Sequence, residues 1–337
     1  MLGSAAGGGF PQWNCGCFNC QGVRSGTIRA VPRRQESVAI SADGEAWTLL
    51  NASPEIRAQI ESFAPLWPRA PRHSPISGIV LGNGDLDHVL GLLSLRESQP
   101  ISVYATAAVW LGFTQGNLLF RTLQRFPGQV TWHPLSLGVE RALGGGEGKS
   151  RGKGGGEVGG DDDRNRDRDG DGDGSGDGDA RLRVSPFAVP GKRPIHLEAP
   201  GGVEAGHAAS PEDNVGLSIR DRLGGGVLAY VPAAARWTPA LDEALAGADV
   251  VFFDGTFWSS DELARAGAGG KRAEDMAHLP VGGSDGSLAR LSRLPARRKI
   301  LIHVNNTNPL LREDSAERAS VDAAGVEVAY DGMEVDA

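Results

Sequence analysis

Residues 82–88 read Gly-Asn-Gly-Asp-Leu-Asp-His, and they directly follow the apolar segment Ile76–Leu81. The apolar segment predicts a short buried strand, so its polar continuation predicts a loop at the strand end. Asp85, Asp87 and His88 carry carboxylate and imidazole groups, which bind zinc, iron and manganese. Taken alone, either aspartate could equally be a solvated loop residue or the N-cap of a following helix.

Two further apolar segments end in the same kinds of group. Residues 249–253 lead into Asp254, and residues 299–302 lead into His303. Asp254 could be an ordinary turn residue, and His303 could be a hydrogen-bonded histidine at a strand end. In sheets flanked by helices, however, ligands gather at the loops beyond strand ends. The three strand ends together predict one metal site with open positions for water, oxygen or substrate.

The cysteines of the chain, Cys15, Cys17 and Cys20, lie within six residues. Neighbours this close make poor disulfide pairs, and an odd number leaves one over. We therefore predict a thiolate metal site in a reducing compartment, with its fourth ligand elsewhere in the chain. Three inert thiols are the alternative. The glycine-rich start, residues 2–9, lacks the Lys-Ser/Thr pair of a P-loop and could be a tight turn that lets backbone approach a metal site.

Strand and helix patterns are mixed along the chain. Hairpins are expected between residues 37–40 and 46–50 and between residues 215–219 and 227–230. Helices are expected from Ser53 as N-cap, over residues 89–95 and over residues 239–246. Mixed elements with antiparallel hairpins favour a mixed α/β sandwich over an all-parallel sheet.

The composition suits one large domain with an interruption. The chain has 337 residues and a formal net charge of −8, of which residues 144–181 carry −4. That stretch is rich in glycine and aspartate and cannot bury a core, so we predict a disordered insertion in a single domain formed by residues 1–143 and 182–337. Its acidic repeat does not fit an EF-hand calcium loop, because both registers lack the final glutamate.

The bulk properties exclude several classes of function. Outside the insertion the chain is only mildly acidic, so nucleic acid or an anionic membrane is not an expected partner. No apolar run approaches the roughly 20 residues that span a bilayer. The first ten residues lack the features of a secretion signal. We therefore expect a cytoplasmic protein.

Six segments together resemble the pyrroloquinoline quinone (PQQ) synthesis protein B family. They are LGSAAGGGFPQWNCGCFNC (2–20), NASPEIRAQ (51–59), DLDHVLGLLSLRE (85–97), DGTFW (254–258), HVNNTNP (303–309) and VEVAYDGM (326–333). Only the insertion is unmatched. The resemblance implies a metallo-β-lactamase fold, an αββα sandwich of two mixed β-sheets with outer helices.

The superfamily signature H-x-H-x-D-H falls on residues 83–88, where Asn83 and Asp85 replace two histidines. The usual middle histidine has no clear counterpart, although His196 and His207 lie in the right region. The resemblance therefore implies a single catalytic metal ion rather than a two-zinc hydrolytic centre. Its expected ligands are Asp85, His88, Asp254 and His303.

In the related phosphonate-pathway phosphodiesterases, a similar cysteine triplet binds structural zinc with a histidine that follows the last catalytic ligand by three residues. The resemblance thus implies structural Zn²⁺ on the cysteine cluster, with Asn306 as the candidate fourth ligand. His278 resembles a proton-handling histidine of related hydrolases, and a surface loop histidine is the alternative. His278 and Asp87 are our candidate catalytic residues. Family members usually begin with a further strand, so we expect the natural start to lie upstream of Met1.

The family acts in PQQ biosynthesis from the Glu-Tyr pair of a peptide precursor, with other PQQ-pathway proteins. The resemblance implies either an iron-dependent oxygenase that hydroxylates the tyrosine-derived ring or a carrier that helps move PQQ or its precursor to the periplasm. We expect the oxygenase, with Fe²⁺ or another first-row divalent ion, because a carrier needs no open metal position. A metal-dependent phosphodiesterase or lactonase is a further alternative, by analogy of fold.

Overall fold

The computed structural model of the protein describes residues 1–97, 99–115, 117–144, 180–197 and 210–337. Nearly all of the predicted insertion at 144–181 lies outside these residues, and so does the acidic repeat that was compared with a calcium loop. So does His207.

Two mixed sheets form the centre of the molecule. In the five-stranded sheet the strands run in the order β1-β2-β3-β4-β5, with β1 and β2 antiparallel and the remaining pairs parallel. The strands are β1 Val38–Ile40, β2 Trp47–Leu50, β3 Ile76–Val80, β4 Ile101–Thr106 and β5 Val130–Leu135.

The seven-stranded sheet has the order β12-β11-β10-β9-β8-β7-β6. Its pairs are parallel from β9 to β12 and antiparallel from β6 to β9. The strands are β6 Arg141–Ala142, β7 Leu182–Ala188, β8 Val215–Asp221, β9 Val227–Val231, β10 Val250–Asp254, β11 Arg298–Ile302 and β12 Glu327–Val328.

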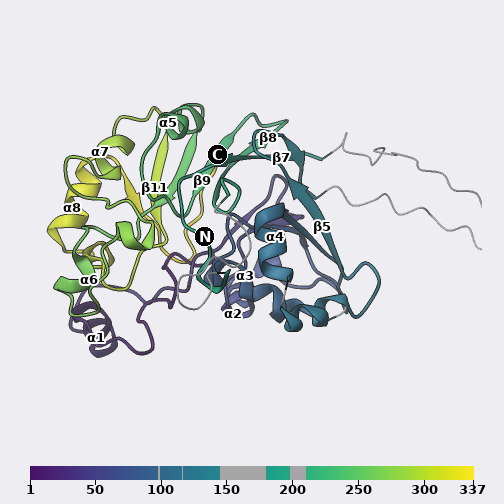
Figure 1. Ribbon diagram of the computed structural model, residues 1–337, viewed down its shortest axis with the longest axis horizontal. Coiled ribbons are helices and arrows are strands. Elements are labelled where there is room, and N and C mark those ends of the chain that lie inside the picture. The colour runs from purple at the N-terminus through teal and green to yellow at the C-terminus, as the bar shows by residue number, and fades with distance from the viewer. Residues whose placement is uncertain (98, 116, 145–179, 198–209) are drawn as a thin grey trace, which may run out of the picture.

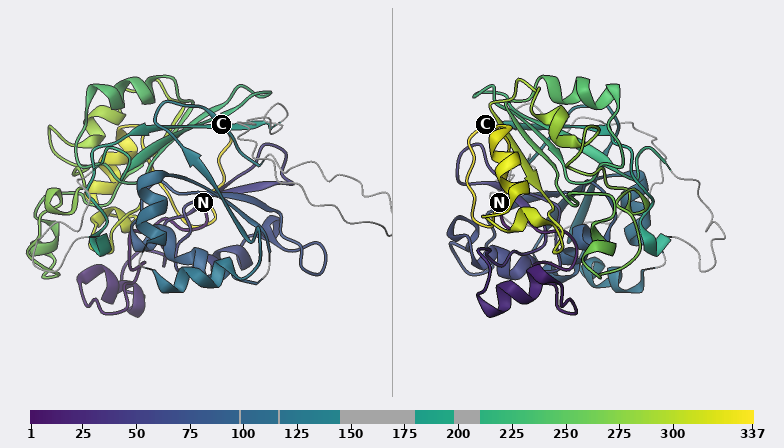
Figure 2. Two further views of the ribbon diagram at one scale, coloured as in Figure 1. Left: turned by 45° about the vertical axis from the view of Figure 1, so that its right-hand side comes forward. Right: turned by 90° about the vertical axis from the view of Figure 1, so that its left-hand side faces the viewer.

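The sheets face each other across a buried apolar layer. Both sheets contribute side chains to it, for example Leu50 from the five-stranded sheet and Phe252 from the seven-stranded sheet. A second apolar layer joins the outer face of the five-stranded sheet to α2 Ile56–Glu61, α3 Leu86–Val89 and α4 Ala107–Thr114. A third joins the seven-stranded sheet to α5 Pro239–Ala246, α7 Ser287–Leu291 and α8 Ala316–Ala323. Helices thus cover both outer faces, as Figures 1 and 2 show, and the expected αββα sandwich is confirmed.

The remaining helical elements are short. They are α1 Phe18–Ser25 and α6 Glu262–Arg265, with the 3-10 helices η1 Ala64–Leu66, η2 Leu90–Leu95, η3 Leu118–Gln124, η4 Ile195–Leu197, η5 Glu274–Met276 and η6 Pro309–Leu311. No helix in the described part of the chain is long and apolar enough to cross a membrane.

Local predictions hold for the strands and less well for the helix starts. Both predicted hairpins form, and α5 has the expected bounds. The helix expected to start after Ser53 begins instead at Ile56, with Glu55 at the N-cap position. The Ser53 hydroxyl is turned towards the Gln59 side chain, 2.9 Å away. The helix expected over residues 89–95 is the 3-10 helix η2, because Gly91 lies against the backbone of Ala52.

Candidate metal centre

Loops from the two sheets meet at one place, beside α3 (Figure 1). Asp87 and His88 belong to α3, which follows β3 of the five-stranded sheet. His303 comes directly after β11 of the seven-stranded sheet, and its Nε2 lies 3.2 Å from Oδ2 of Asp87. The backbone of His303 has a φ of 58°, a left-handed conformation that is unfavourable for a residue with a side chain. Such strain is characteristic of residues held in place for function.

Hydrogen bonds determine which nitrogen of His88 faces the centre. Oδ1 of Asn83 accepts the backbone N–H of Asp85 at 3.0 Å, and it lies 2.6 Å from Nδ1 of His88. Because this oxygen is an acceptor, His88 must carry its proton on Nδ1. In the neutral ring Nε2 of His88 then has a free lone pair, and this atom is buried with no hydrogen-bond partner among the described residues.

His303 is oriented in the same manner from the other sheet. Its Nδ1 lies 2.8 Å from the hydroxyl of Thr256, and the Thr256 hydroxyl donates to Oδ1 of Asp254 at 2.6 Å. The Nε2 side of the ring faces Asp87. Two buried imidazoles thus direct their Nε2 atoms towards the same region, as metal-binding histidines do when a second group holds Nδ1.

Asp254 is surrounded by donors. Oδ1 accepts the backbone N–H and the hydroxyl of Thr256, and Oδ2 accepts the backbone N–H of Ala234 at 2.9 Å. Nδ1 of His278 lies 2.7 Å from Oδ2. Burial alone would raise the pKa of Asp254, but the neighbouring His278 and the donated hydrogen bonds hold the pKa below its usual value.

Two groups of side chains could each hold a metal ion. One consists of Asp87, His88 and His303, and the other of Asp254, His278 and His303, with ligand atoms within 4.8 Å of one another in each. Asp85 belongs to neither group; it occupies the N-cap position of α3. His303 is common to the two groups, so the structure places His88 in one group with it and Asp254 in the other, and Asp87 lies with His88. It places His278 in the centre rather than on the surface.

The charges of the centre favour a cation. Burial alone would lower the pKa of His303, but the hydrogen bond and negative charge of Asp87 outweigh it and raise the pKa to about 9. Desolvation alone would raise the pKa of Asp87, but His88 and His303 hold this pKa well below its usual range. Buried carboxylates next to inward-facing Nε2 atoms form a donor set that fits a first-row divalent ion.

Sequence reasoning missed a buried group next to this centre. Glu36 precedes β1, and its carboxyl receives hydrogen bonds from Tyr230 and Asn51. Burial raises the pKa of Glu36, although nearby His88 opposes the effect. No single motif joins these residues, because they come from three separate parts of the chain.

The cysteine cluster forms a second centre. The sulfur atoms of Cys15, Cys17 and Cys20 lie within 4.8 Å of one another. Nδ2 of Asn306 lies 3.1, 3.7 and 3.3 Å from the three sulfurs in that order. The buried Asn306 side chain thus lies at the fourth corner of the cluster, and rotating its amide by half a turn would present the oxygen instead.

A polar cavity of about 630 Å³ lies at the cysteine cluster. Its lining includes Cys15, the amide side chains of Gln12 and Asn305, and Gly7. A Cβ atom on Gly7 would lie 3.1 Å from Oδ2 of Asp87, so the glycine-rich turn does bring backbone close to the candidate ligands.

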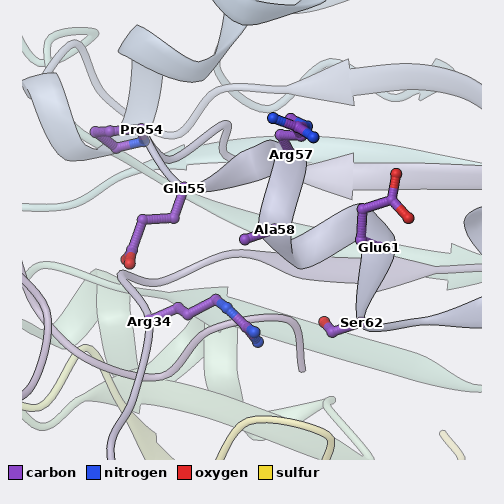
Figure 3. Close-up of a pocket in the computed structure, with 7 residues that line it drawn as sticks. All are labelled: Arg34, Pro54, Glu55, Arg57, Ala58, Glu61 and Ser62. Carbon is purple, nitrogen blue, oxygen red and sulfur yellow. The ribbon is translucent and has the colours of Figure 1, made fainter.

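A cavity of about 590 Å³ beside α2 has no histidine or cysteine in its lining, and Figure 3 shows Arg57 and Glu61 there pointing away from Arg34.

Comparison with known proteins agrees with this architecture. The family model for the Beta-lactamase superfamily domain matches residues 46–304. Coenzyme PQQ synthesis protein B of Azotobacter vinelandii is 42% identical over 337 residues, which cover 100% of this chain and 98% of the relative. The chain belongs to the coenzyme PQQ synthesis protein B family, within the metallo-β-lactamase superfamily.

Solved structures extend the comparison. The crystal structure of Zn(2+)-bound PqqB from Methylobacterium extorquens is 40% identical, with a TM-score of 0.82 and coverage of 100% of this chain and 98% of that one. A diphosphatase from the PhnP family is 19% identical, with a TM-score of 0.59 and coverage of 100% and 96%, and it shows the fold alone. The expected metallo-β-lactamase fold is therefore confirmed.

Proposed function

We propose that the protein acts in PQQ biosynthesis as an iron-dependent oxygenase that hydroxylates the tyrosine-derived part of a Glu-Tyr precursor. The observation that carries this proposal is the set of Asp87, His88 and His303. Two histidines and one carboxylate with open positions are typical of non-haem Fe(II) oxygenases. The names of the relatives support the pathway.

The residues around the metal centre would have different roles in this reaction. Bound iron would supply the activation of dioxygen. Asn83 and Thr256 contact the Nδ1 atoms of His88 and His303, which would leave the two Nε2 atoms to hold the ion. Asp254 holds His278 by its Nδ1, which leaves Nε2 to exchange a proton with the substrate; the ring stacks on His303 with centroids 5.5 Å apart. Asp254 thereby acts chiefly on His278 in this proposal.

The precursor would approach through the polar cavity. Amide side chains line this cavity, which suits hydrogen bonds to the peptide and carboxyl groups of a Glu-Tyr unit. The cysteine cluster with Asn306 would bind structural Zn²⁺ at the cavity wall. The zinc in the relative's structure and the tetrahedral preference of zinc for thiolates support this assignment.

The test is an oxygenation assay with purified, zinc-loaded protein. Each hydroxylation consumes one O₂, two electrons and two protons and releases one water, so the assay contains Fe(II), oxygen, a small-molecule reductant that supplies the electrons and a Glu-Tyr-derived substrate. The expected product gains one oxygen atom per turnover, detected by mass spectrometry with ¹⁸O₂. His88→Ala and His303→Ala should abolish turnover. His196→Ala should retain it, because His196 is exposed on η4 and lies outside both candidate ligand groups.

Retained oxygenation in both ligand variants would contradict the proposal. The two alternatives predict different results. A carrier predicts that cytosolic synthesis continues without the protein and that only periplasmic PQQ is lost, whereas the oxygenase predicts that synthesis stops. A phosphodiesterase predicts robust hydrolysis of generic phosphodiesters with added zinc or manganese.

A further inference from the structure

Glu36 is a buried carboxyl beside the metal centre. Its side chain is fully buried, with 0% exposure. Burial of a carboxylate is unfavourable unless the group is paired or binds a cation. No arginine or lysine makes a salt bridge to Glu36 within the described part of the chain, where its ion-pair contact is with His88.

Both sheets hold the Glu36 side chain. Tyr230 on β9 donates its hydroxyl to Oε2 at 2.6 Å, and Asn51, just after β2, donates its amide to the same oxygen at 3.0 Å. Tyr230 and Asn51 are themselves fully buried, and they are hydrogen bonded to each other at 2.8 Å. Both donors reach one oxygen, so Oε1 is left with no partner among the described residues.

The carboxyl of Glu36 lies next to the imidazole ring of His88. Oε2 lies 3.8 Å from Nε2 of His88, which is too far for a direct hydrogen bond. Nε2 of His88 and Oε1 of Glu36 are both buried polar atoms that lack a partner within the described residues. Two ligands of one first-row ion lie up to about 4.2 Å apart, twice the usual metal–ligand distance. A cation held between these side chains would satisfy both.

Asp254 differs from Glu36 in this respect. Its two oxygens already have four hydrogen-bond contacts, with Thr256, Ala234 and His278. Asp254 is therefore suited to orient its neighbours, whereas Glu36 retains an oxygen for an ion.

We propose that Glu36, which lies outside the two ligand groups but next to His88, is a further ligand of the catalytic metal ion, and that Tyr230 and Asn51 hold it in position. This proposal rests on the metal centre of the proposed function. Two carboxylates would balance the charge of a divalent ion, and their oxygen donors would favour iron or manganese over softer ions.

The test is a titration of metal-stripped protein, whose cysteine cluster has been reloaded with zinc, with Mn²⁺. The electron paramagnetic resonance signal of the free Mn²⁺ reports how much of the ion is unbound. Glu36→Gln should weaken Mn²⁺ binding about tenfold or more. Tyr230→Phe should weaken it several-fold, because Glu36 loses its strongest orienting bond. Glu55→Gln is the matched carboxyl control, since Glu55 accepts the backbone N–H of Gln35 at 2.7 Å and belongs to neither ligand group. Tyr104→Phe is the matched control for Tyr230→Phe, because Tyr104 is also a buried tyrosine. Both controls should bind as the wild type does.

His88→Ala separates this proposal from the metal centre itself. Wild-type affinity in Glu36→Gln with loss in His88→Ala would refute the role of Glu36 and leave the centre intact. Wild-type affinity in both variants would refute the centre.

Thermal unfolding provides the second readout. If Glu36 were only structural, the metal-free Glu36→Gln variant would unfold at a lower temperature and keep its metal-induced stabilisation. We expect the opposite: the metal-free variant is at least as stable, because a buried charge has been removed, and the stabilisation by Mn²⁺ is lost. Should Glu36→Gln fail to fold, unchanged Mn²⁺ affinity in Tyr230→Phe would overturn the proposal.

Discussion

Oδ1 of Asn83 lies 2.6 Å from Nδ1 of His88, at a position where the superfamily signature has a metal-binding histidine. Here the side chain orients a ligand instead of being one. Asn83→Ala should therefore leave the fold intact and weaken metal binding at the centre about tenfold, because Nε2 of His88 is no longer held as the free acceptor. Mn²⁺ titration measures the effect.

Asn117→Ala is the control for this substitution. Asn117 caps η3, where its side chain accepts the backbone N–H of Leu119 at 3.1 Å. Its loss should lower stability by about 1 kcal/mol and leave Mn²⁺ affinity unchanged. Equal metal affinity in Asn83→Ala and the wild type would show that the asparagine does not set the state of His88.

Gly7 gives a second prediction, at the contact between the N-terminal turn and Asp87. A methyl group at this position would lie 3.1 Å from Oδ2 of Asp87, close enough to displace the carboxyl from His303. Gly7→Ala should thus reduce metal affinity about tenfold while the unfolding temperature changes little. Gly247→Ala is the matched control, because nothing among the described residues lies within 4 Å of the added methyl. Full metal affinity in Gly7→Ala would mean that Asp87 tolerates displacement.

The parts of the centre that could be predicted from sequence are those in which adjacent residues carry the signal. Apolar segments followed by Asp254 and His303 predict strand-end ligands, and the spacing of the cysteines predicts their cluster. The choice between Asp85 and Asp87 was beyond such reasoning, since it depends on the direction of each side chain in a single helical turn: Asp85 is the N-cap of α3, while Asp87 lies in its first turn and reaches His303.

Glu36 shows a different limit. Its partners Asn51 and Tyr230 lie 15 and 194 residues away, on opposite sheets of the sandwich. Only the packing of one sheet on the other brings them together, so no local pattern could reveal the network. The role of Thr256 also could not be predicted from the sequence. Its hydroxyl, two residues after Asp254, becomes informative only when the fold places it beside His303.

The cysteine cluster makes a third prediction, on its fourth corner. Asn306 lies 3.1 to 3.7 Å from the three sulfurs, so Asn306→His should add a better zinc ligand and Asn306→Ala should remove a weak one. Zinc release to a chromogenic chelator should become slower in the histidine variant and several-fold faster in the alanine variant. The same release rate in all three proteins would place the fourth ligand elsewhere.

A fourth prediction concerns Glu262, a buried carboxyl on α6 that accepts the backbone N–H of Trp258 and the hydroxyl of Thr307 next to Asn306. Burial raises the pKa of Glu262 from 4.5 to about 7, despite these hydrogen bonds. Below pH 4.5 the folded and unfolded states both keep the proton. Between pH 4.5 and 7 the unfolded state loses it first, so the free energy of unfolding falls, by about 3 kcal/mol in total, and then levels off.

Glu262→Gln should remove this decline, because glutamine does not ionise and can still bridge Trp258 and Thr307. Urea unfolding at pH 5 and pH 8 provides the measurement: the variant should gain stability relative to the wild type as the pH rises. Glu243→Gln, at an exposed position on α5, should follow the wild type at both values. A stability difference between Glu262→Gln and the wild type that is the same at pH 5 and pH 8 would mean that Glu262 ionises equally in the folded and unfolded states.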